Sequence, residues 1–441
     1  MKIKMCGIAG AIINNVREAE KFLLETQERG RDSFGVSGIV NGKVWRWKGL
    51  KPDSFSLPEG IKIAIAESRA EPTTEWVKEK KHADIPPFDD GFWFVAHNGT
   101  ISNDKILKEK YKIQTQTIID SALLPNLFTR KGFSSIKEIE GNFAIIAFNT
   151  EEDYIYLTNN YRPLYVIRDL DSRNLYIASR PWRVKGIDFR YQVFQVPGYS
   201  AYKCNEEKCF ELFKLEREMD PQRRVLVIAS GGLDSTVTAK ILEDNNYKPI
   251  LLHFNYGHRA LKKEREAIRK ISEKMGWDLI EVDMNFFSDF IKSSSLLNRL
   301  KPITRLERSA EFPHEWVPSR NLIFASLAVG LAEELGVNYV SLGINMEESN
   351  YPDNEPEAYE KLNEILHYFV APNKYVRIIN PVGNLVKHEI VKEGVERGAP
   401  LELTWSCYED GDKHCGICGP CYMRKRAFEM NGLDDPVFKR E

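Results

Sequence analysis

The stretch at residues 225–236 constrains the fold of this chain more than any other. It reads VLVIASGGLDST, an aliphatic run followed by a Ser-Gly-Gly turn. A continuous aliphatic run of this length is typical of a buried parallel strand. We expect this strand to end at the turn and a helix to follow over residues 237–243, with the Asp-Ser-Thr before it capping the helix start.

The turn between this strand and this helix has the chemistry of a phosphate cradle. Gly231 and Gly232 let backbone N–H groups turn inward, and the helix N-terminus adds a partial positive charge. Ser230, Asp234 and Ser235 border the same turn. The stretch lacks the Gly-Lys-Ser/Thr ending of an ordinary P-loop. It resembles instead the pyrophosphatase-type (PP) loop of ATP-dependent ligases, which cleave ATP between its α and β phosphates. An ordinary glycine turn is the alternative.

The length and the charge of the chain limit the number of domains and the kinds of partner that we expect. At 441 residues it is too long for one ordinary core, so we expect two or three domains. The net charge of −2 gives no overall basic face for nucleic acid. No apolar run approaches the ~20 residues needed to span a bilayer, and no signal peptide is evident. We therefore expect a cytoplasmic protein without a membrane partner, and we also expect a homo-oligomer.

The first part of the chain carries a cysteine followed by several polar motifs. Cys6 precedes a glycine at the edge of a short predicted strand, which makes the thiol accessible. The motifs that follow are RGRDSFG at 29–35, ESRA at 67–70, HNG at 97–99, DS at 120–121 and EGNFA at 140–144. In this order they resemble the class II glutamine amidotransferase domain, over most of residues 6–170. The resemblance implies an α/β fold of the N-terminal nucleophile (Ntn) hydrolase type, with αββα layers.

The same resemblance implies a role for each motif. Cys6 would attack the side-chain amide of glutamine. Asn98 and the backbone N–H of Gly99 would form the oxyanion hole. Arg69 would hold the α-carboxylate of glutamine through a bidentate contact, and Asp120 would hold its α-ammonium group.

The position of Cys6 leaves glutaminase activity open. The family uses the free α-amino group of this cysteine as the general base, with a pKa near ~8. Cys6 has that amine only if Met1 to Met5 are absent, for example if translation starts at Met5 and this methionine is removed. Otherwise the domain needs processing or is an inactive scaffold. The chain also departs from the family pattern at Arg31, where proline is usual, and at residues 67–68, where His-Thr is usual.

The boundary between two domains is expected near residues 214–222. Between residues 198 and 224 the sequence loses both helical and strand periodicity, and KLEREMDPQ at 214–222 is charged and contains Asp-Pro. We therefore expect an amidotransferase-like domain over residues 1–213, a linker over 214–222, and a nucleotide-binding domain over 223–441.

The second domain alternates strands with helices. We expect strands at 249–255, 279–282 and 339–343 and helices at 262–275 and 322–335. Such alternation predicts a doubly wound parallel sheet with ligands bound at the carboxyl ends of its strands. Polar segments follow these strands, and among them Arg259 and Arg320 are the expected phosphate ligands. Asp234 is the expected ligand of Mg²⁺ together with the pyrophosphate oxygens.

Six of the cysteines lie in two groups. Cys204 and Cys209 are interpreted as unremarkable cysteines in a tight turn, with a metal pair as the alternative. The C-terminal group is Cys407, Cys415, Cys418 and Cys421. Four thiolates at this spacing suit a closed tetrahedral zinc site, and an iron–sulfur cluster is the alternative. Disulfides are not expected in the C-terminal group.

A second resemblance covers roughly residues 223–430. The PP-loop, FNYGHR at 254–259, VPSRN at 317–321, YPD at 351–353 and the four cysteines match, in order, the 7-cyano-7-deazaguanine synthase family. Those enzymes activate 7-carboxy-7-deazaguanine with ATP, admit ammonia, and form an amide and then a nitrile, with zinc as a structural ion. Tyr351 and Asp353 would recognise the deazaguanine. The family often continues with Cys-Arg where this chain has Asn-Glu, which leaves the substrate open.

Three functions remain open from the sequence. The first is a ligase that uses ATP and glutamine to adenylate the 7-carboxylate of a 7-deazaguanine and add ammonia. The second is a tRNA amidotransferase, because fusions of these two domains resemble archaeal proteins linked to archaeosine formation. The intact ATP loop favours the first, and the basic segment MRKR at 423–426 is interpreted as a solvated helix face rather than an RNA contact. The third is a ligase with an inactive amidotransferase domain, in this pathway or in a defence pathway.

Overall fold

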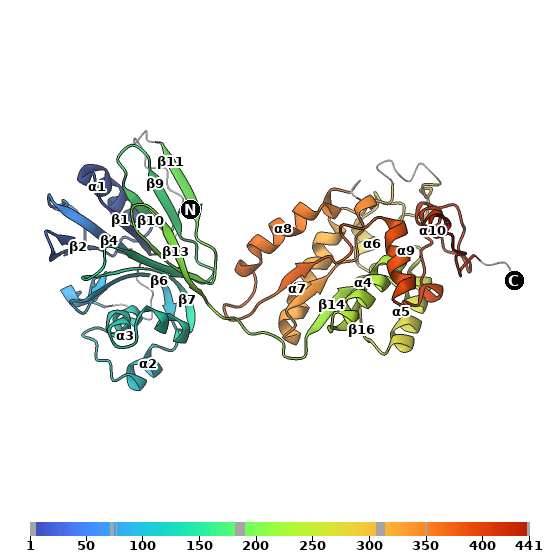
Figure 1. The fold of residues 1–441 in the computed structure, drawn as a ribbon, viewed down its shortest axis with the longest axis horizontal. Helices are drawn as coiled ribbons and strands as arrows, with labels where there is room; N and C mark the ends of the chain where they lie inside the picture. Colours follow the sequence, from blue (N-terminus) through green and yellow to red (C-terminus); the bar gives the residue numbers. More distant parts are fainter. Residues whose placement is uncertain are drawn as a thin grey trace. The chain divides into compact units, whose positions relative to one another are not determined.

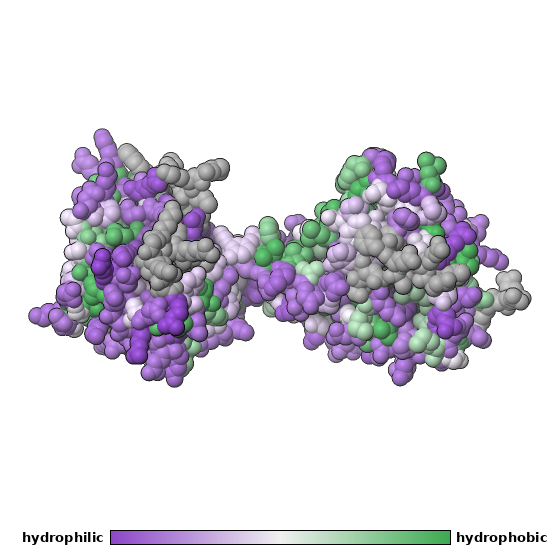
Figure 2. All heavy atoms as spheres, turned by 90° about the horizontal axis from the view of Figure 1, so that it is seen from above, coloured by the Kyte–Doolittle hydropathy of each residue, from purple (hydrophilic) through white to green (hydrophobic). Residues whose placement is uncertain are grey.

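The computed structural model of the chain divides into two compact units, Met1–Glu216 and Arg217–Glu441 (Figure 1). It describes residues 6–70, 75, 77–180, 190–305, 314–348 and 351–438. Within these ranges, no helix combines the length and apolar character needed to cross a bilayer. The surface shown in Figure 2 is largely hydrophilic with scattered hydrophobic patches, in keeping with a charged-residue content of 29%.

Two antiparallel sheets form the centre of the first unit. The seven-stranded sheet has the order β11-β9-β10-β1-β4-β2-β3, and the six-stranded sheet has the order β13-β12-β8-β7-β6-β5. The strands of the first sheet are β1 (Gly7–Ile12), β2 (Ser33–Val40), β3 (Lys43–Gly49), β4 (Ile61–Arg69), β9 (Tyr165–Asp169), β10 (Leu175–Ala178) and β11 (Tyr191–Gln195). Those of the second are β5 (Phe88–Asp89), β6 (Trp93–Ile101), β7 (Gly141–Asn149), β8 (Ile155–Asn159), β12 (Ser200–Cys204) and β13 (Cys209–Lys214).

Alternate side chains of a strand point to opposite faces of its sheet, so one set packs between the two sheets and the other packs against the helices. Ile8 of β1 packs with Phe94 and Ile146 of the facing sheet, so these residues form the core between the sheets. The neighbouring Ala9 faces the opposite way, onto α1 (Val16–Leu24). On the outer face of the second sheet lie α2 (Asp104–Lys110), the 3₁₀ turn η4 (Asp120–Leu123) and α3 (Leu124–Lys131). The αββα layering expected from the sequence is confirmed.

The segment after residue 198 differs from the sequence prediction. It was expected to lack regular structure, but β12 and β13 form a hairpin on the edge of the second sheet. The outer strand β13 is half-exposed and mixes charged with aromatic residues, which hides the alternation. Cys204 and Cys209 face each other across this hairpin and form a disulfide. The interpretation of these two cysteines as unremarkable was therefore wrong, as was the metal-pair alternative.

The second unit is a doubly wound domain around a parallel sheet. Its strand order is β16-β15-β14-β17-β18, and all the pairs are parallel. The strands are β14 (Arg224–Ile228), β15 (Lys248–Asn255), β16 (Asp278–Asp283), β17 (Tyr339–Ser341) and β18 (Arg377–Ile379). The helices are α4 (Leu233–Asp244), α5 (Leu261–Met275), α6 (Phe287–Phe290), α7 (Arg320–Leu335), α8 (Pro356–Ile365), α9 (Lys387–Glu396) and α10 (Gly419–Met430). The predicted elements of this domain are confirmed to within a few residues.

Both faces of the parallel sheet are buried, as its aliphatic central strand requires. Val225 and Val227 of β14 pack against α4 and α5 on one face. Leu226, between them, packs on the other face with Phe324 and Ala328 of α7. Because helices cover both faces, the ligand-binding edge is left at the carboxyl ends of the strands.

The start of α4 differs from the expected capped helix. The helix begins at Leu233, before the Asp-Ser-Thr sequence, and Gly232 is its N-cap residue without a side-chain cap. The hydroxyl of Thr236 instead donates back to the carbonyl of Gly232 at 2.8 Å. Asp234 therefore lies in the first helical turn, where its carboxylate is free for contacts outside the backbone.

Candidate functional site

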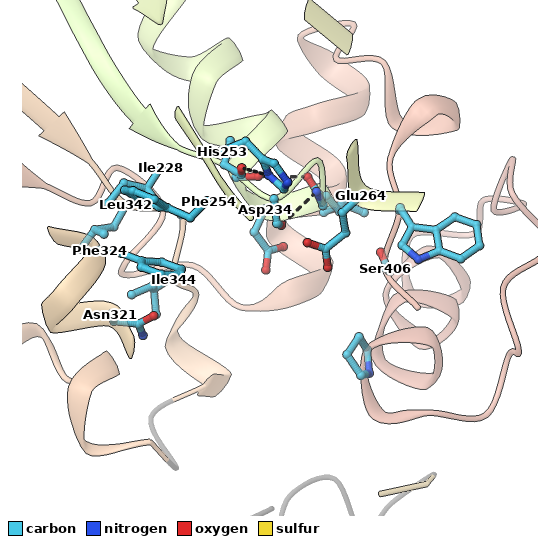
Figure 3. Close-up of a pocket in the computed structure, with 18 of the residues that line it drawn as sticks. Ile228, Asp234, His253, Phe254, Glu264, Asn321, Phe324, Leu342, Ile344 and Ser406 are labelled. Carbon is cyan, nitrogen blue, oxygen red and sulfur yellow. Dashed lines mark hydrogen bonds between the residues drawn. The ribbon is translucent and has the colours of Figure 1, made fainter. Parts of the chain in front are cut away.

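A cavity of about 220 Å³ lies at the carboxyl ends of β14, β15 and β17 (Figure 3). One wall is apolar and includes Ile228, Phe254 and Phe324. The polar lining comes from five separate segments of the second unit and includes Ser230, Gly232, Asp234, Ser235, His253, Glu264, Arg320, Asn321 and Lys387. This is the position at which doubly wound domains bind their ligands.

The backbone at the centre of the Ser-Gly-Gly turn adopts a conformation that requires glycine. Gly231 has a φ of +81°, and a Cβ atom there would lie 2.9 Å from the backbone oxygen of Glu264. The carbonyl of Gly231 accepts the N–H of Trp405 at 2.9 Å. The turn is thus packed from outside by α5 and by a C-terminal segment, while Ser230 and Gly232 line the cavity.

Asp234 holds a lysine that the sequence analysis missed. The ammonium of Lys387, the first residue of α9, lies 2.6 Å from Asp234 Oδ2, and both side chains are about one-tenth exposed. Asn345 donates to the same oxygen at 2.9 Å. The other oxygen, Oδ1, is buried without a hydrogen-bond partner among the described residues. An orphaned carboxylate oxygen in a polar cavity fits a Mg²⁺ ligand.

The two predicted phosphate ligands have different surroundings. Arg320 lines the cavity, and its guanidinium donates to the hydroxyl of Tyr256 at 3.4 Å. Arg259 is not among the cavity-lining residues, and it donates to the backbone carbonyls of Asn298 and Lys301. The structure therefore brings Arg320, but not Arg259, together with the Ser-Gly-Gly turn.

The Tyr-Pro-Asp motif at 351–353 does not line this cavity itself, but residues in contact with it do. Asp353 accepts the N–H of Asn321 at 3.3 Å, and its Oδ1 is buried without a partner among the described residues. Asn321 and Asn354, which line the cavity, are joined by a hydrogen bond of 2.7 Å. Tyr351 stacks on Trp316 instead, with 5.6 Å between the ring centres. Burial raises the pKa of Asp353, while nearby Arg320 opposes this shift.

The four C-terminal cysteines come together as predicted. Their sulfur atoms all lie within 4.8 Å of one another. Backbone N–H groups of Glu409 and Cys415 each approach the sulfur of Cys407 at 3.4 Å, a contact typical of metal-bound thiolates. The donor set and the compactness fit a tetrahedral metal such as zinc.

Two basic residues beside the cysteine cluster are engaged in contacts within the second unit. His414 is engaged elsewhere: its ring stacks on Trp405, and its Nε2 accepts the N–H of Ser406 at 3.1 Å. Arg424 is fully buried and forms an ion pair with Asp435 at 2.8 Å. The interpretation of residues 423–426 as a solvated face was therefore wrong for Arg424, because a helix this close to the cluster turns one basic residue inward.

In the first unit, Cys6 lies just before β1 and is half-buried. Its sulfur lies 3.5 Å from the backbone nitrogen of Ala70, at the end of β4. Burial, followed by the negative charge of Glu67, raises the pKa of the thiol to about 12. Such a thiol needs a base before it can act as a nucleophile. Whether Cys6 carries its own amine depends on residues 1–5, which lie outside the described residues.

The Asn98–Gly99 pair lies in β6, in the facing sheet. Asn98 is buried. A Cβ atom at Gly99 would lie 1.9 Å from the carbonyl oxygen of Asn142, so glycine is required for the close approach of β6 and β7. The backbone N–H of the preceding His97 donates to Glu67 Oε2 at 2.9 Å, which ties β6 to β4. Burial raises the pKa of Glu67 to about 8.

Arg69 and Asp120 meet at one carboxylate, that of Glu75. Arg69 Nη2 lies 2.6 Å from Glu75 Oε2, and the backbone N–H of Asp120 donates to Glu75 Oε1 at 3.2 Å. The carboxylate of Asp120 accepts the N–H of Ile101 at 2.6 Å. The two residues expected to hold the α-groups of glutamine thus border a position that already accommodates a carboxylate.

Comparison with known families agrees with this division of the chain. Residues 77–184 match the family described as a glutamine amidotransferase domain, which includes Asn98, Gly99 and Asp120. Residues 224–432 match the family described as queuosine biosynthesis protein QueC, which includes the cavity and the cysteine cluster. Among solved structures, a glutamine phosphoribosylpyrophosphate amidotransferase from B. subtilis covers 90% of both chains at 14% identity, with a TM-score of 0.38.

Curated relatives match over the whole length. A 7-cyano-7-deazaguanine synthase of Sulfolobus acidocaldarius is 42% identical and covers 98% of this chain and 99% of the relative. A 7-cyano-7-deazaguanine synthase 2 of Sulfurisphaera tokodaii is 44% identical with the same coverage. The synthase of Campylobacter curvus is 36% identical and aligns over 97% of its own length with 49% of this chain. The chain therefore belongs to the 7-cyano-7-deazaguanine synthase family, in a form that also carries a glutamine amidotransferase domain.

Proposed function

We propose that the protein converts 7-carboxy-7-deazaguanine to its amide and nitrile, with ATP as the activator and glutamine as the nitrogen source. The observation that carries this proposal is the cavity at the Ser-Gly-Gly turn, where Asp234, Lys387 and Arg320 converge. Two cationic side chains beside a glycine turn at the start of a helix suit a triphosphate whose pyrophosphate must leave.

In the activation step, a carboxylate oxygen of the substrate attacks the α-phosphorus of ATP and pyrophosphate leaves. Lys387 and Arg320 stabilise the charge that develops on pyrophosphate, and Asp234 keeps the ammonium of Lys387 in position. Mg²⁺, held by Asp234 Oδ1, would screen the phosphate oxygens. Asn321 and Asn354 present amides to the acceptor base, which supports a role for the Asp353 segment in its recognition.

In the nitrogen-releasing step, the thiol of Cys6 attacks the side-chain amide of glutamine and forms a thioester with loss of ammonia. Asn98 and the N–H of Gly99 would stabilise the oxyanion. Arg69 and Asp120 would hold the α-carboxylate and the α-ammonium group. The carboxylate of Glu75 between them supports this assignment, because it shows that an anion fits beside Arg69. Water then hydrolyses the thioester to glutamate.

The cysteine cluster is proposed to hold a structural zinc ion. Its four sulfurs leave no coordination position for a substrate, which is the arrangement of structural rather than catalytic zinc.

The proposal is tested by supplying the two nitrogen sources separately to the purified enzyme. Cys6→Ala should abolish product formation from glutamine and leave the rate with ammonium salts within about twofold of the wild type. Asp234→Ala should abolish ATP turnover with either source. Mass spectrometry of the product distinguishes amide from nitrile. Full activity of Cys6→Ala with glutamine would contradict the proposed nucleophile. Turnover only with tRNA that carries the deazaguanine would contradict the proposed free substrate.

A further inference from the structure

A buried histidine at the end of β15 has one ring nitrogen committed to the backbone. The Nδ1 atom of His253 lies 3.0 Å from the carbonyl oxygen of Ala229. A carbonyl only accepts hydrogen bonds, so Nδ1 must carry the proton. Burial lowers the pKa of His253 and keeps the ring neutral. The second nitrogen, Nε2, is therefore an acceptor with a free lone pair.

This acceptor has no partner within the described residues, although it is buried. His253 is 1% exposed, its Nε2 has no hydrogen bond, and the residue lines the cavity (Figure 3). A buried acceptor that is left unpaired costs about 1–3 kcal/mol. A donor supplied by a bound ligand would remove this cost.

The charged neighbours of His253 do not supply the missing donor. Glu264 also lines the cavity, and its Oε2 lies 2.8 Å from His258 Nε2. Burial pushes the pKa of Glu264 upward, but the pairing with His258 outweighs it and leaves the pKa below its ordinary value. Glu264 is thus ionised near neutral pH and can only accept. His258 has its Nε2 engaged with Glu264.

We propose that Nε2 of His253 accepts a hydrogen bond from the exocyclic amino group of adenine and so selects ATP. This inference rests on the function proposed above. Phosphates have no donor near neutral pH, whereas adenine presents an amine at the edge of a flat apolar ring. Ala229, which anchors the histidine, directly precedes Ser230 of the phosphate turn. Ile228 and Phe254, neighbours of these residues in the chain, line the cavity with the apolar surface that a base requires.

The test compares ATP with purine riboside triphosphate, which lacks only the amino group. Binding to the full-length protein is measured by titration calorimetry. The wild type should bind ATP about tenfold more tightly, the effect of leaving one buried acceptor unpaired. His253→Asn keeps a donor toward Ala229 but removes the second nitrogen, so it should bind both nucleotides equally. His253→Gln places an amide oxygen near Nε2 and should restore most of the preference. His82→Asn, an exposed histidine of the first unit, is the control.

Three outcomes would count against this assignment in different ways. A preference for ATP that persists in a folded His253→Asn variant would overturn the role of the histidine. If this variant kept the preference but lost discrimination between 7-carboxy-7-deazaguanine and its analogue without the 2-amino group, the acceptor would serve the other substrate, and the assignment to adenine would be wrong. If the wild type bound neither nucleotide, the proposed function itself would fail.

Discussion

Lys387 Nζ lies 2.6 Å from Asp234 Oδ2, and this ion pair joins the first residue of α9 to the first turn of α4. The two residues are 153 positions apart in the sequence. Both are largely removed from water, so each charge depends on the other for compensation. Both residues line the cavity, and because their opposite charges compensate each other, the pair adds almost no net charge to it.

Lys387→Met should lower ATP turnover with ammonium by about 100-fold or more and also lower the melting temperature. The carboxylate of Asp234 would lose its main partner, and breaking one half of a buried pair costs about 3–5 kcal/mol. Steady-state pyrophosphate release and differential scanning calorimetry measure the two effects.

The matched control for this substitution is Lys392→Met, on the exposed part of the same helix. It should leave both quantities near the wild-type values. The double variant Lys387→Met/Asp234→Asn removes the uncompensated charge and should recover stability without recovering turnover. Recovery of turnover in that variant would argue that the pair only stabilises the fold.

Glu67→Gln should increase the reactivity of Cys6 toward iodoacetamide, but only at alkaline pH. The pKa of Glu67 is raised to about 8 by burial, so below pH 8 the carboxyl is neutral and the substitution changes little. Above pH 8 its negative charge opposes formation of the thiolate, whose pKa burial and this charge raise to about 12. Alkylation of the Cys6 peptide, followed by mass spectrometry from pH 7 to 10, measures the divergence. Glu79→Gln, an exposed carboxyl, is the control. Parallel profiles for Glu67→Gln and the wild type would mean that the two groups are not coupled.

Cys418→Ser should release the metal and weaken ATP binding by about tenfold. The cluster residue Cys407 follows Trp405 and Ser406 in the chain, and Trp405 donates to the carbonyl of Gly231 in the phosphate turn. Loss of the metal would therefore disorder a wall of the cavity. Atomic absorption gives the metal content, and calorimetry gives the affinity for ATP. Cys204→Ser, which lies in the first unit, should leave both unchanged. Stoichiometric zinc in the Cys418→Ser protein would exclude the proposed ligand set.

Alkylation of the unfolded, metal-stripped chain should modify five cysteines without reductant and seven with it. The free cysteines are Cys6 and the four of the cluster, while Cys204 and Cys209 are joined. Intact mass spectrometry counts the added groups. Seven modified cysteines in both samples would show that the hairpin disulfide is absent from the purified protein.

The doubly wound domain was predictable because its signals are local. An aliphatic strand, a glycine turn and an amphipathic helix can each be recognised from a stretch of about ten residues. As a result, α5 and β15 start within one residue of the predicted positions. The cysteine cluster was predictable for the same reason. Cys204 and Cys209 were misread because the half-exposed edge strand β13 gives no clear alternation, so the hairpin that pairs the two cysteines was not expected.

The parts of the site that escaped prediction depend on distant contacts. Nothing around Lys387 in the sequence indicates that its side chain reaches Asp234. Arg259 and Arg320 are equally basic in sequence, but backbone carbonyls bind the first, whereas the second lines the cavity. Arg424 looks solvated within a basic run until helix α10 packs it against Asp435. Each of these outcomes is decided by packing between segments, which local patterns do not encode.

The segment after Glu216 forms hydrogen bonds and an ion pair with the second unit. The N–H of Glu218 donates to the carbonyl of Asn373 at 3.0 Å, and the carboxylate of Asp220 accepts from Arg224 at 2.8 Å. In the first unit, the N–H of Leu215 donates to the carbonyl of Tyr199 at 2.8 Å. A gene split at the Glu216–Arg217 junction therefore severs none of these bonds. If the two halves were separated there and supplied in trans, each would keep the hydrogen bonds of its own terminal segment. A split after Asp220 would instead leave Arg224, at the start of β14, without its carboxylate partner.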